Sequence, residues 1–181
     1  MKKIISVLLF LLLAGGAAQA MDFMIGAKAH YMHPSDEMFR EVYGGGFMFG
    51  GGLGVRIINL VEIWVDGSYF SKTGELTYTG EETKITLFPI GVEGRVFLPL
   101  SVVKLYGGAG LAYYNFKESN ILGEVEKSAL GVRFKAGVVI ELPVKLSIDV
   151  FGGYSLCKMT PVAIEIDVGG IEAGLGLRYG F

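Results

Sequence analysis

The sequence lacks the features that would cross-link a small domain or give it a strong charge. It has one cysteine, Cys157, which excludes an internal disulfide and a cysteine-based metal cluster. Its 16 Lys and Arg residues are outnumbered by 18 Asp and Glu residues, giving a formal net charge of −2. This balance excludes the basic surface of a nucleic-acid-binding protein. No cofactor motif is present, and we predict none.

Long apolar runs are also missing after residue 20. Although 51% of the residues are hydrophobic, no later run approaches the roughly 20 residues that a membrane-spanning helix needs. The hydrophobic residues must therefore be spread over many short elements. This distribution is typical of strands.

The first 20 residues have the pattern of a secretory signal peptide. Lys2 and Lys3 precede an apolar stretch over residues 4–14, and Ala18-Gln19-Ala20 provides small residues at a cleavage site. An uncleaved anchor helix is the alternative, but the apolar stretch is short for a span. We predict a signal peptide at residues 1–20 and one domain at residues 21–181.

The rest of the chain alternates with a period of two. At the C-terminus an apolar face alternates with a polar or small one that contains Glu172 and Arg178. Seven upstream segments repeat this alternation, and no apolar face among them carries a charge. The eight segments are residues 22–31, 47–57, 61–69, 88–96, 103–113, 130–141, 144–154 and 169–181. We predict an all-β fold, an eight-stranded antiparallel up-and-down transmembrane barrel.

The connections between these segments alternate in length. Tight turns are expected near residues 58–60, 98–101 and 141–143. Longer polar connections are expected at residues 33–45, 71–83, 117–128 and 157–166. This order is typical of an outer-membrane barrel with short periplasmic turns and four long outer loops.

Three features indicate that the apolar face meets lipid. Glycines weaken strands, so their abundance on the polar face favours a crowded lumen over a solvated surface. Charges are absent from the apolar face, where lipid would make them costly. Aromatic residues stand at the ends of the apolar faces and predict two interfacial girdles: Phe23, Tyr31, Tyr69, Tyr113, Tyr154, Tyr179 and Phe181. A secreted soluble barrel is the alternative.

Two residues depart from the strand pattern. Pro89 falls inside a strand and has no N–H to donate, so we expect a bulge or kink there. Trp64 falls on the lumen side by parity. It either fills a narrow lumen or marks a slip in the expected register.

The charges of the polar face predict a network inside the barrel. Buried charges must be paired or hydrated, and eight strands leave little bore. We therefore favour ion pairs that fill the barrel over a polar path for small solutes. The network comprises Lys28, Arg56, Glu62, Asp66, Glu93, Arg95, Lys104, Arg133, Lys135, Asp149, Glu172 and Arg178.

In its strand pattern the chain resembles the small outer-membrane β-barrel family of the OmpA/OmpX-like type. The most specific motif is the C-terminal strand, residues 174–181, which alternates and ends in phenylalanine. The resemblance implies that Leu175, Leu177, Tyr179 and Phe181 form a signal for the barrel assembly machinery. It also implies residence in the outer membrane of a Gram-negative bacterium, among lipids and lipopolysaccharide, and a fold whose members have diverse roles.

Other clusters are weaker candidates. His30, His33, Ser35, Asp36 and Glu37 offer the residue types of a lipid-modifying hydrolase at the membrane rim, or of a metal site at the two histidines. The glycines at 44–46 and 50–54 do not fit a phosphate-binding loop, because a strand rather than a helix follows them. Cys157 is expected to be a surface thiol.

We therefore expect a non-enzymatic, monomeric outer-membrane barrel with a structural or surface-interaction role through its outer loops. A narrow channel or a transporter of small hydrophobic molecules is the first alternative. A lipid-modifying enzyme is the second. The mildly acidic loops at 72–84 and 117–127 are candidates for contact with cations that bridge lipopolysaccharide, or with another partner.

Overall fold

The computed structural model shows an elongated barrel, and it describes residues 22–58, 60–75, 82–100, 103–121, 123–160 and 165–181. The predicted signal peptide lies outside these residues. The elements are β1 (Asp22–Pro34), α2 (Glu37–Tyr43), β2 (Gly46–Ile58), β3 (Val61–Glu75), β4 (Glu82–Leu100), β5 (Val103–Asn120), β6 (Gly123–Glu141), β7 (Leu146–Leu156), β8 (Lys158–Met159), β9 (Ile166–Asp167) and β10 (Gly170–Gly180). Within the described parts, no helix has the length and hydropathy needed to cross a membrane.

Eight of the strands close into an antiparallel barrel, as predicted. Their order around the ring is β1-β10-β7-β6-β5-β4-β3-β2, and β8 and β9 form a separate small hairpin. Closure occurs between the first and last strands, where Ala27 pairs with Leu177 and Tyr31 with Ala173. A closed ring gives the strands hydrogen-bond partners on both sides, which a lipid environment demands.

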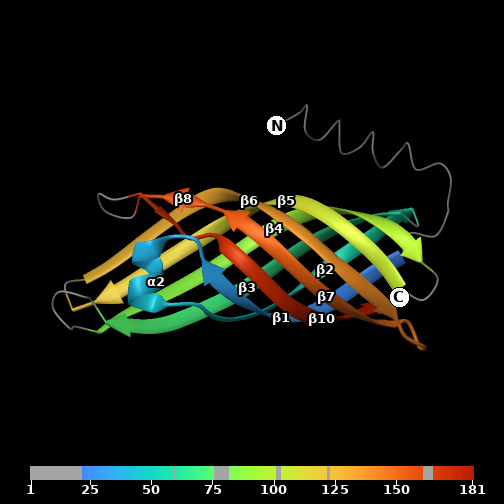
Figure 1. Ribbon diagram of the computed structural model, residues 1–181, viewed down its shortest axis with the longest axis horizontal. Coiled ribbons are helices and arrows are strands. Elements are labelled where there is room, and N and C mark those ends of the chain that lie inside the picture. Colours follow the sequence, from blue (N-terminus) through green and yellow to red (C-terminus); the bar gives the residue numbers. More distant parts are fainter. Residues whose placement is uncertain (1–21, 59, 76–81, 101–102, 122, 161–164) are drawn as a thin grey trace, which may run out of the picture.

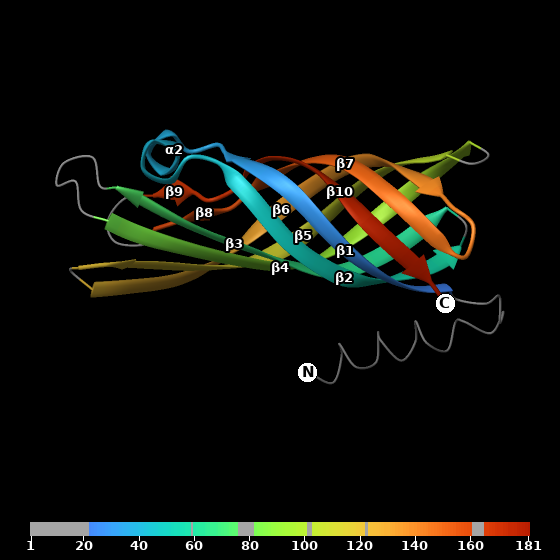
Figure 2. The ribbon, with the colours of Figure 1, turned by 90° about the horizontal axis from the view of Figure 1, so that it is seen from below.

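The two ends of the barrel differ. One end, here the loop end, carries α2 and the β8–β9 hairpin; the other, the terminus end, holds the C-terminus and the tight turns (Figure 1). The turned view shows the same separation, with the long β3–β4 and β5–β6 hairpins extending at the loop end (Figure 2). The first and fourth loop-end connections contain α2 and β8–β9 respectively.

Two of the four expected long loops are mostly strand. β3 continues to Glu75 and β4 begins at Glu82, while β5 reaches Asn120 and β6 begins at Gly123. The expectation of loops at 71–83 and 117–128 is therefore wrong for their described parts. Polar composition suggested loops, yet cross-strand pairing continues through these residues, for example between Lys117 and Glu126.

The expected bulge at Pro89 is also absent. The β3–β4 register is the same at Gly67↔Ile90 and at Phe70↔Leu87, but the pairing is interrupted between them, opposite Pro89. On its other side Pro89 remains paired with Tyr114. A missing N–H is thus accommodated without inserting a residue. The register shift instead lies between β2 and β3, at residues 56–58, beside a tight turn.

The outward face of the barrel is apolar. Leu175, Val65 and Leu111 are each at least half exposed, whereas Asp66, Arg95 and Asp149 are buried inside. A one-residue slip would exchange these two sets. The alternation in the sequence therefore assigned the two faces correctly.

Leu175→Arg tests this assignment against Gly176→Ser, one residue away. Leu175 is 58% exposed on the outer face, and a charge at mid-depth in lipid costs about 2–4 kcal/mol. A Cβ at Gly176 first meets Ala27 O at 3.3 Å and then Asp149 Cβ at 3.5 Å, so a serine requires only a small adjustment. We expect the arginine variant to give much less folded, heat-modifiable protein in vesicles; equal yields would overturn the register.

Candidate functional site

The interior of the barrel contains charged and apolar layers. Buried charges fill the middle and the terminus-end half, and a cluster of buried apolar side chains fills the loop-end half. Both layers use inward-facing positions of the strands, and the apolar layer also takes side chains from α2 and the β8–β9 segment. The interior is therefore the candidate functional site.

Asp66 on β3 lies among three cations. Its carboxylate accepts a hydrogen bond from Lys28 Nζ and, at 2.6 Å, from Arg133 Nη2. Lys135 Nζ lies 3.9 Å from the same carboxylate. All three cations are largely buried, so Asp66 offsets charge that would otherwise be costly inside the barrel.

Glu93 on β4 is the second acceptor in this layer. It accepts a hydrogen bond from Arg95 Nε at 2.6 Å and lies 3.1 Å from Lys135 Nζ. Arg95 Nη1 also donates to Asp149 at 3.2 Å, and the Tyr106 hydroxyl donates to the other Asp149 oxygen at 3.0 Å. We call the joined group the central cluster: Lys28, Asp66, Glu93, Arg95, Arg133, Lys135 and Asp149.

A second group lies toward the terminus end around Glu62. This buried carboxylate accepts hydrogen bonds from Arg178 Nη2, from Arg56 Nη2 at 2.9 Å and from Trp64 Nε1 at 2.9 Å. Arg56 lies 3.7 Å from Asp22, which is half-exposed. Lys104 and Glu141 form a pair of 2.6 Å at the same end. We call this group the mouth cluster: Asp22, Arg56, Glu62, Lys104, Glu141 and Arg178.

Trp64 connects the two clusters. Its ring lies between two guanidinium groups, with Arg95 Cζ at 5.0 Å and Arg178 Cζ at 4.8 Å from the ring centroid. Such cation–π contacts gain strength when desolvated. Gly54 and Gly26 make room for the ring, because a Cβ on Gly54 would lie 2.4 Å from it and one on Gly26 3.3 Å. Trp64 thus fills the lumen, and the register does not slip at this position.

Glu172 stands apart from both clusters. Its carboxylate lies 3.6 Å from His30 Nε2 and accepts a hydrogen bond from Ser155 Oγ at 3.3 Å. The His30 ring packs 5.8 Å from that of Phe151. The structure therefore brings eleven of the twelve predicted network residues into the two clusters and places Glu172 at the border of the apolar layer.

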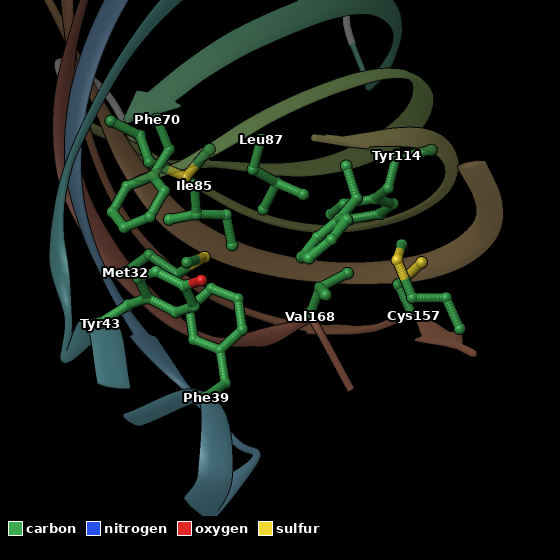
Figure 3. Close-up of a cluster of buried hydrophobic side chains, with 13 residues drawn as sticks. Met32, Phe39, Tyr43, Phe70, Ile85, Leu87, Tyr114, Cys157 and Val168 are labelled. Carbon is green, nitrogen blue, oxygen red and sulfur yellow. The ribbon is translucent and has the colours of Figure 1, made fainter. Parts of the chain in front are cut away.

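The apolar layer was not predicted. Thirteen buried residues form this outer core (Figure 3): Met32, Phe39, Tyr43, Met48, Phe70, Ile85, Leu87, Ala112, Tyr114, Phe116, Cys157, Met159 and Val168. Phe70 has the same parity as Asp66, and Leu87 the same parity as Glu93. Parity predicts that both side chains point inward, but the prediction of a polar inward face did not include them.

Helix α2 covers the outer core at the loop end. Asp36 caps the helix by accepting a hydrogen bond from Phe39 N at 3.0 Å. Arg40 Nη1 donates to the backbone oxygens of Pro34 and Ser35 at 3.1 and 2.9 Å. Phe39 and Tyr43 thereby point into the barrel, where the Tyr43 hydroxyl lies 3.1 Å from Thr83 Oγ1.

The hydrolase candidates are not brought together. His30 is buried in the lumen, whereas His33 is exposed on the opposite face of β1. Ser35 Oγ lies 3.4 Å from the Tyr154 hydroxyl, and Asp36 is occupied by the helix cap. His30 and His33 likewise cannot share one metal ion, since they point to opposite sides of the barrel wall.

Glu37 belongs to the first turn of α2 and is exposed. Its carboxylate lies near the N-terminus of the helix, where the positive end of the helix dipole stabilises a negative charge.

The prediction that Cys157 is a surface thiol is wrong. The thiol is buried in the outer core rather than exposed, and burial raises its pKa to about 12. The reason is local: Asp167 accepts hydrogen bonds from the Cys157 and Gly169 backbone N–H groups at 2.9 Å each, which folds the β8–β9 segment over the barrel. A thiol in this setting is a packing residue.

The described residues line a larger and a smaller cavity along the interior. The larger, about 310 Å³, opens at the terminus end and is lined by mouth-cluster residues together with Lys145 and Ser147. The smaller, about 30 Å³, lies in the central layer between Trp64 and Phe151. It is large enough for one or two water-sized occupants.

The outward-facing candidates lie on the barrel surface. All seven predicted girdle residues are exposed there, and Leu175 and Leu177 continue the same face of β10. At the loop end, Lys117 Nζ and Glu124 form an exposed pair of 2.7 Å. Glu118 instead points inward and accepts a hydrogen bond from Thr83 Oγ1 at 3.1 Å, while Glu81 lies outside the described residues.

A family model described as outer membrane protein beta-barrel domain matches residues 5–181. The chain belongs to this outer-membrane β-barrel family. Membership implies the outer membrane as its location and agrees with the predicted resemblance. Among proteins with curated functions, no sequence matches significantly.

Solved structures share the fold at low identity. OprG from Pseudomonas aeruginosa has a TM-score of 0.70 at 15% identity, covering 90% of this chain and 96% of that chain. Neisserial surface protein A has 0.66 at 20%, covering 88% and 97%. Ail of Yersinia pestis, in complex with the heparin analogue sucrose octasulfate, has 0.55 at 15%, covering 89% and 100%. These similarities show a common barrel fold.

Gly54→Ala tests whether the glycines make room for Trp64. The new Cβ would lie 2.4 Å from the ring, and overpacking of this kind costs about 1–3 kcal/mol. We expect a lower free energy of unfolding in urea, and recovery when Trp64→Leu is added. Gly94→Ala is the matched control, since nothing lies within 4 Å of its Cβ. Equal losses in the two alanine variants would contradict the packing account.

Proposed function

We propose that this protein is a closed barrel that acts at the cell surface through its loop end. The observation that carries the proposal is the filled interior. The two charged clusters and the outer core occupy successive layers of the lumen, and α2 lies over the last of them. Solute passage would require these contacts to open together.

The loop end extends beyond the part of the barrel that faces lipid. β4, β5 and β6 contain 19, 18 and 19 residues, whereas a membrane-spanning strand needs about 9–11. On the outward face, residues change from apolar to polar just past the tyrosines: Tyr69 is followed by Ser71, and Tyr113 by Asn115 and Lys117. The parts of β3 and β5 beyond Tyr69 and Tyr113, together with the parts of β4 and β6 paired with them, are called the projecting sheet.

The chemistry of the projecting sheet suits contact with lipopolysaccharide. Its outward positions include Lys84 and Lys117 as well as Glu124 and Glu126, all exposed. Lysines attract phosphate groups, and carboxylates attract the cations that bridge them. We infer a monomeric barrel that matures by loss of residues 1–20 and assembles through its C-terminal strand.

Transport of small hydrophobic molecules is the second candidate. The outer core supports it, because thirteen apolar residues in the loop-end lumen would suit an apolar ligand if α2 moved. In the structure these side chains pack against one another. Uptake of a hydrophobic dye into vesicles that contain the protein would favour this candidate.

Planar-bilayer recording tests the closed lumen. The refolded protein should be electrically silent, and Glu172→Gln should be silent too, because Glu172 lies outside the two charged clusters. Arg178→Gln breaks the contact with Glu62, and the central cluster should still block the bore. Reproducible openings whose ion selectivity changes in the variants would refute the closed lumen and establish a channel.

Contact with lipopolysaccharide is tested separately. The unfolding temperature should be higher in vesicles containing lipopolysaccharide than in phospholipid alone, and Lys84→Glu with Lys117→Glu should reduce that difference. Lys145→Glu at the terminus end is the matched control and should preserve it. A difference unaffected by the loop-end pair would remove the proposed contact.

A further inference from the structure

The two charged clusters differ in their balance of charge. The mouth cluster holds three cations and three carboxylates, whereas the central cluster holds four cations and only three carboxylates. The central cluster is also the better buried, since each of its side chains is at most 11% exposed. With every group ionised, the central cluster carries one net positive charge, and the remaining lumen carboxylate, Glu172, lies outside it, 3.6 Å from His30 Nε2. Such a charge is costly away from water.

The cavity of about 30 Å³ lies at the place where this excess is concentrated. Four cationic side chains and two carboxylates line it: Lys28, Arg95, Lys135, Arg178, Asp66 and Asp149. The walls contributed by Trp64, Phe151 and strand glycines are apolar or small. Since about 10–15 Å³ admits one water-sized occupant, the space suits a small ion and excludes a large one.

Unpartnered donors provide an independent observation. Arg178 is 4% exposed, yet its Nε and Nη1 atoms have no hydrogen-bond partner among the described residues. Arg133 Nε likewise has no hydrogen-bond partner among the described residues. Buried donors of this kind are rare in folded proteins because each loses its water without replacement. A small acceptor beside Arg178 would satisfy donors that the protein does not.

We propose that the lumen binds one small monovalent anion, of about the size of chloride, in the central cavity. The anion neutralises the excess charge of the central cluster and accepts hydrogen bonds from the cationic side chains around it. It is a structural ion, held between the strands of the barrel. The mouth cluster, being balanced, needs no such partner.

Anion-dependent stability tests this proposal. The protein is refolded and unfolded by heat in sodium chloride, sodium bromide or sodium gluconate at equal ionic strength. Chloride and bromide should raise the unfolding temperature relative to gluconate, whose anion is too large for the cavity. The rise should be roughly 5 to 10 °C when the halide is about 100-fold above its dissociation constant.

Two lysine variants separate the cavity from the protein surface. Lys28→Gln removes the excess charge while Asp66 keeps its 2.6 Å contact with Arg133, so the difference between halide and gluconate should disappear. Lys104→Gln, in the mouth cluster, makes the same chemical change away from the cavity and should keep the difference. A wild-type protein indifferent to the anion, or a Lys28→Gln variant that keeps the full effect, would overturn the proposal.

Crystals grown in bromide decide the matter if Lys28→Gln fails to fold. The wild-type protein should show an anomalous bromide peak between Lys28, Lys135 and Arg178. Absence of such a peak in well-ordered crystals would overturn the anion site and indicate water or a neutral lysine in its place. Neither result bears on whether the barrel conducts, so the proposed surface role is tested independently.

Discussion

The pairing of charges inside the barrel is the constraint on which the rest of the structure depends. The outward face is apolar for lipid, so inward positions must hold the charged side chains of the strands. An eight-stranded bore has little room for water, and the carboxylates of the two charged clusters therefore meet their cations directly. Asp66, with three cations around it, shows how closely these positions are coupled across different strands.

This coupling explains the composition of the lumen wall. Large planar groups such as Trp64 lie against guanidinium groups, and glycines on neighbouring strands leave the space that the ring requires. Toward the loop end the inward residues become apolar and pack beneath α2. A charged layer thus fixes the register around the ring, and an apolar layer closes the end that carries the surface hairpins.

The fold was predictable because alternation is a local signal that recurs in every strand. Parity alone predicted which residues face inward, as the twelve charged ones do, and which face outward, as the seven aromatic ones do. The outer core was missed because parity gives a side chain's direction but not its depth, so Phe70 and Leu87 were not separated from Asp66 and Glu93. The buried Cys157 and the separation of His30 from Ser35 depend on how α2 and β8–β9 fold back, which no strand pattern contains.

The most direct measurement of this account compares Asp66→Asn with Asp22→Asn in urea unfolding of the protein in vesicles. Asp66 is buried among three cations, whereas Asp22 is half-exposed and 3.7 Å from Arg56. Asp66→Asn leaves buried cations without their partner and should lower the free energy of unfolding by about 3–5 kcal/mol. Asp22→Asn, at an exposed site, should change it by no more than about 0.5 kcal/mol. Similar small losses in both variants would contradict the claim that paired charges inside the barrel determine its structure.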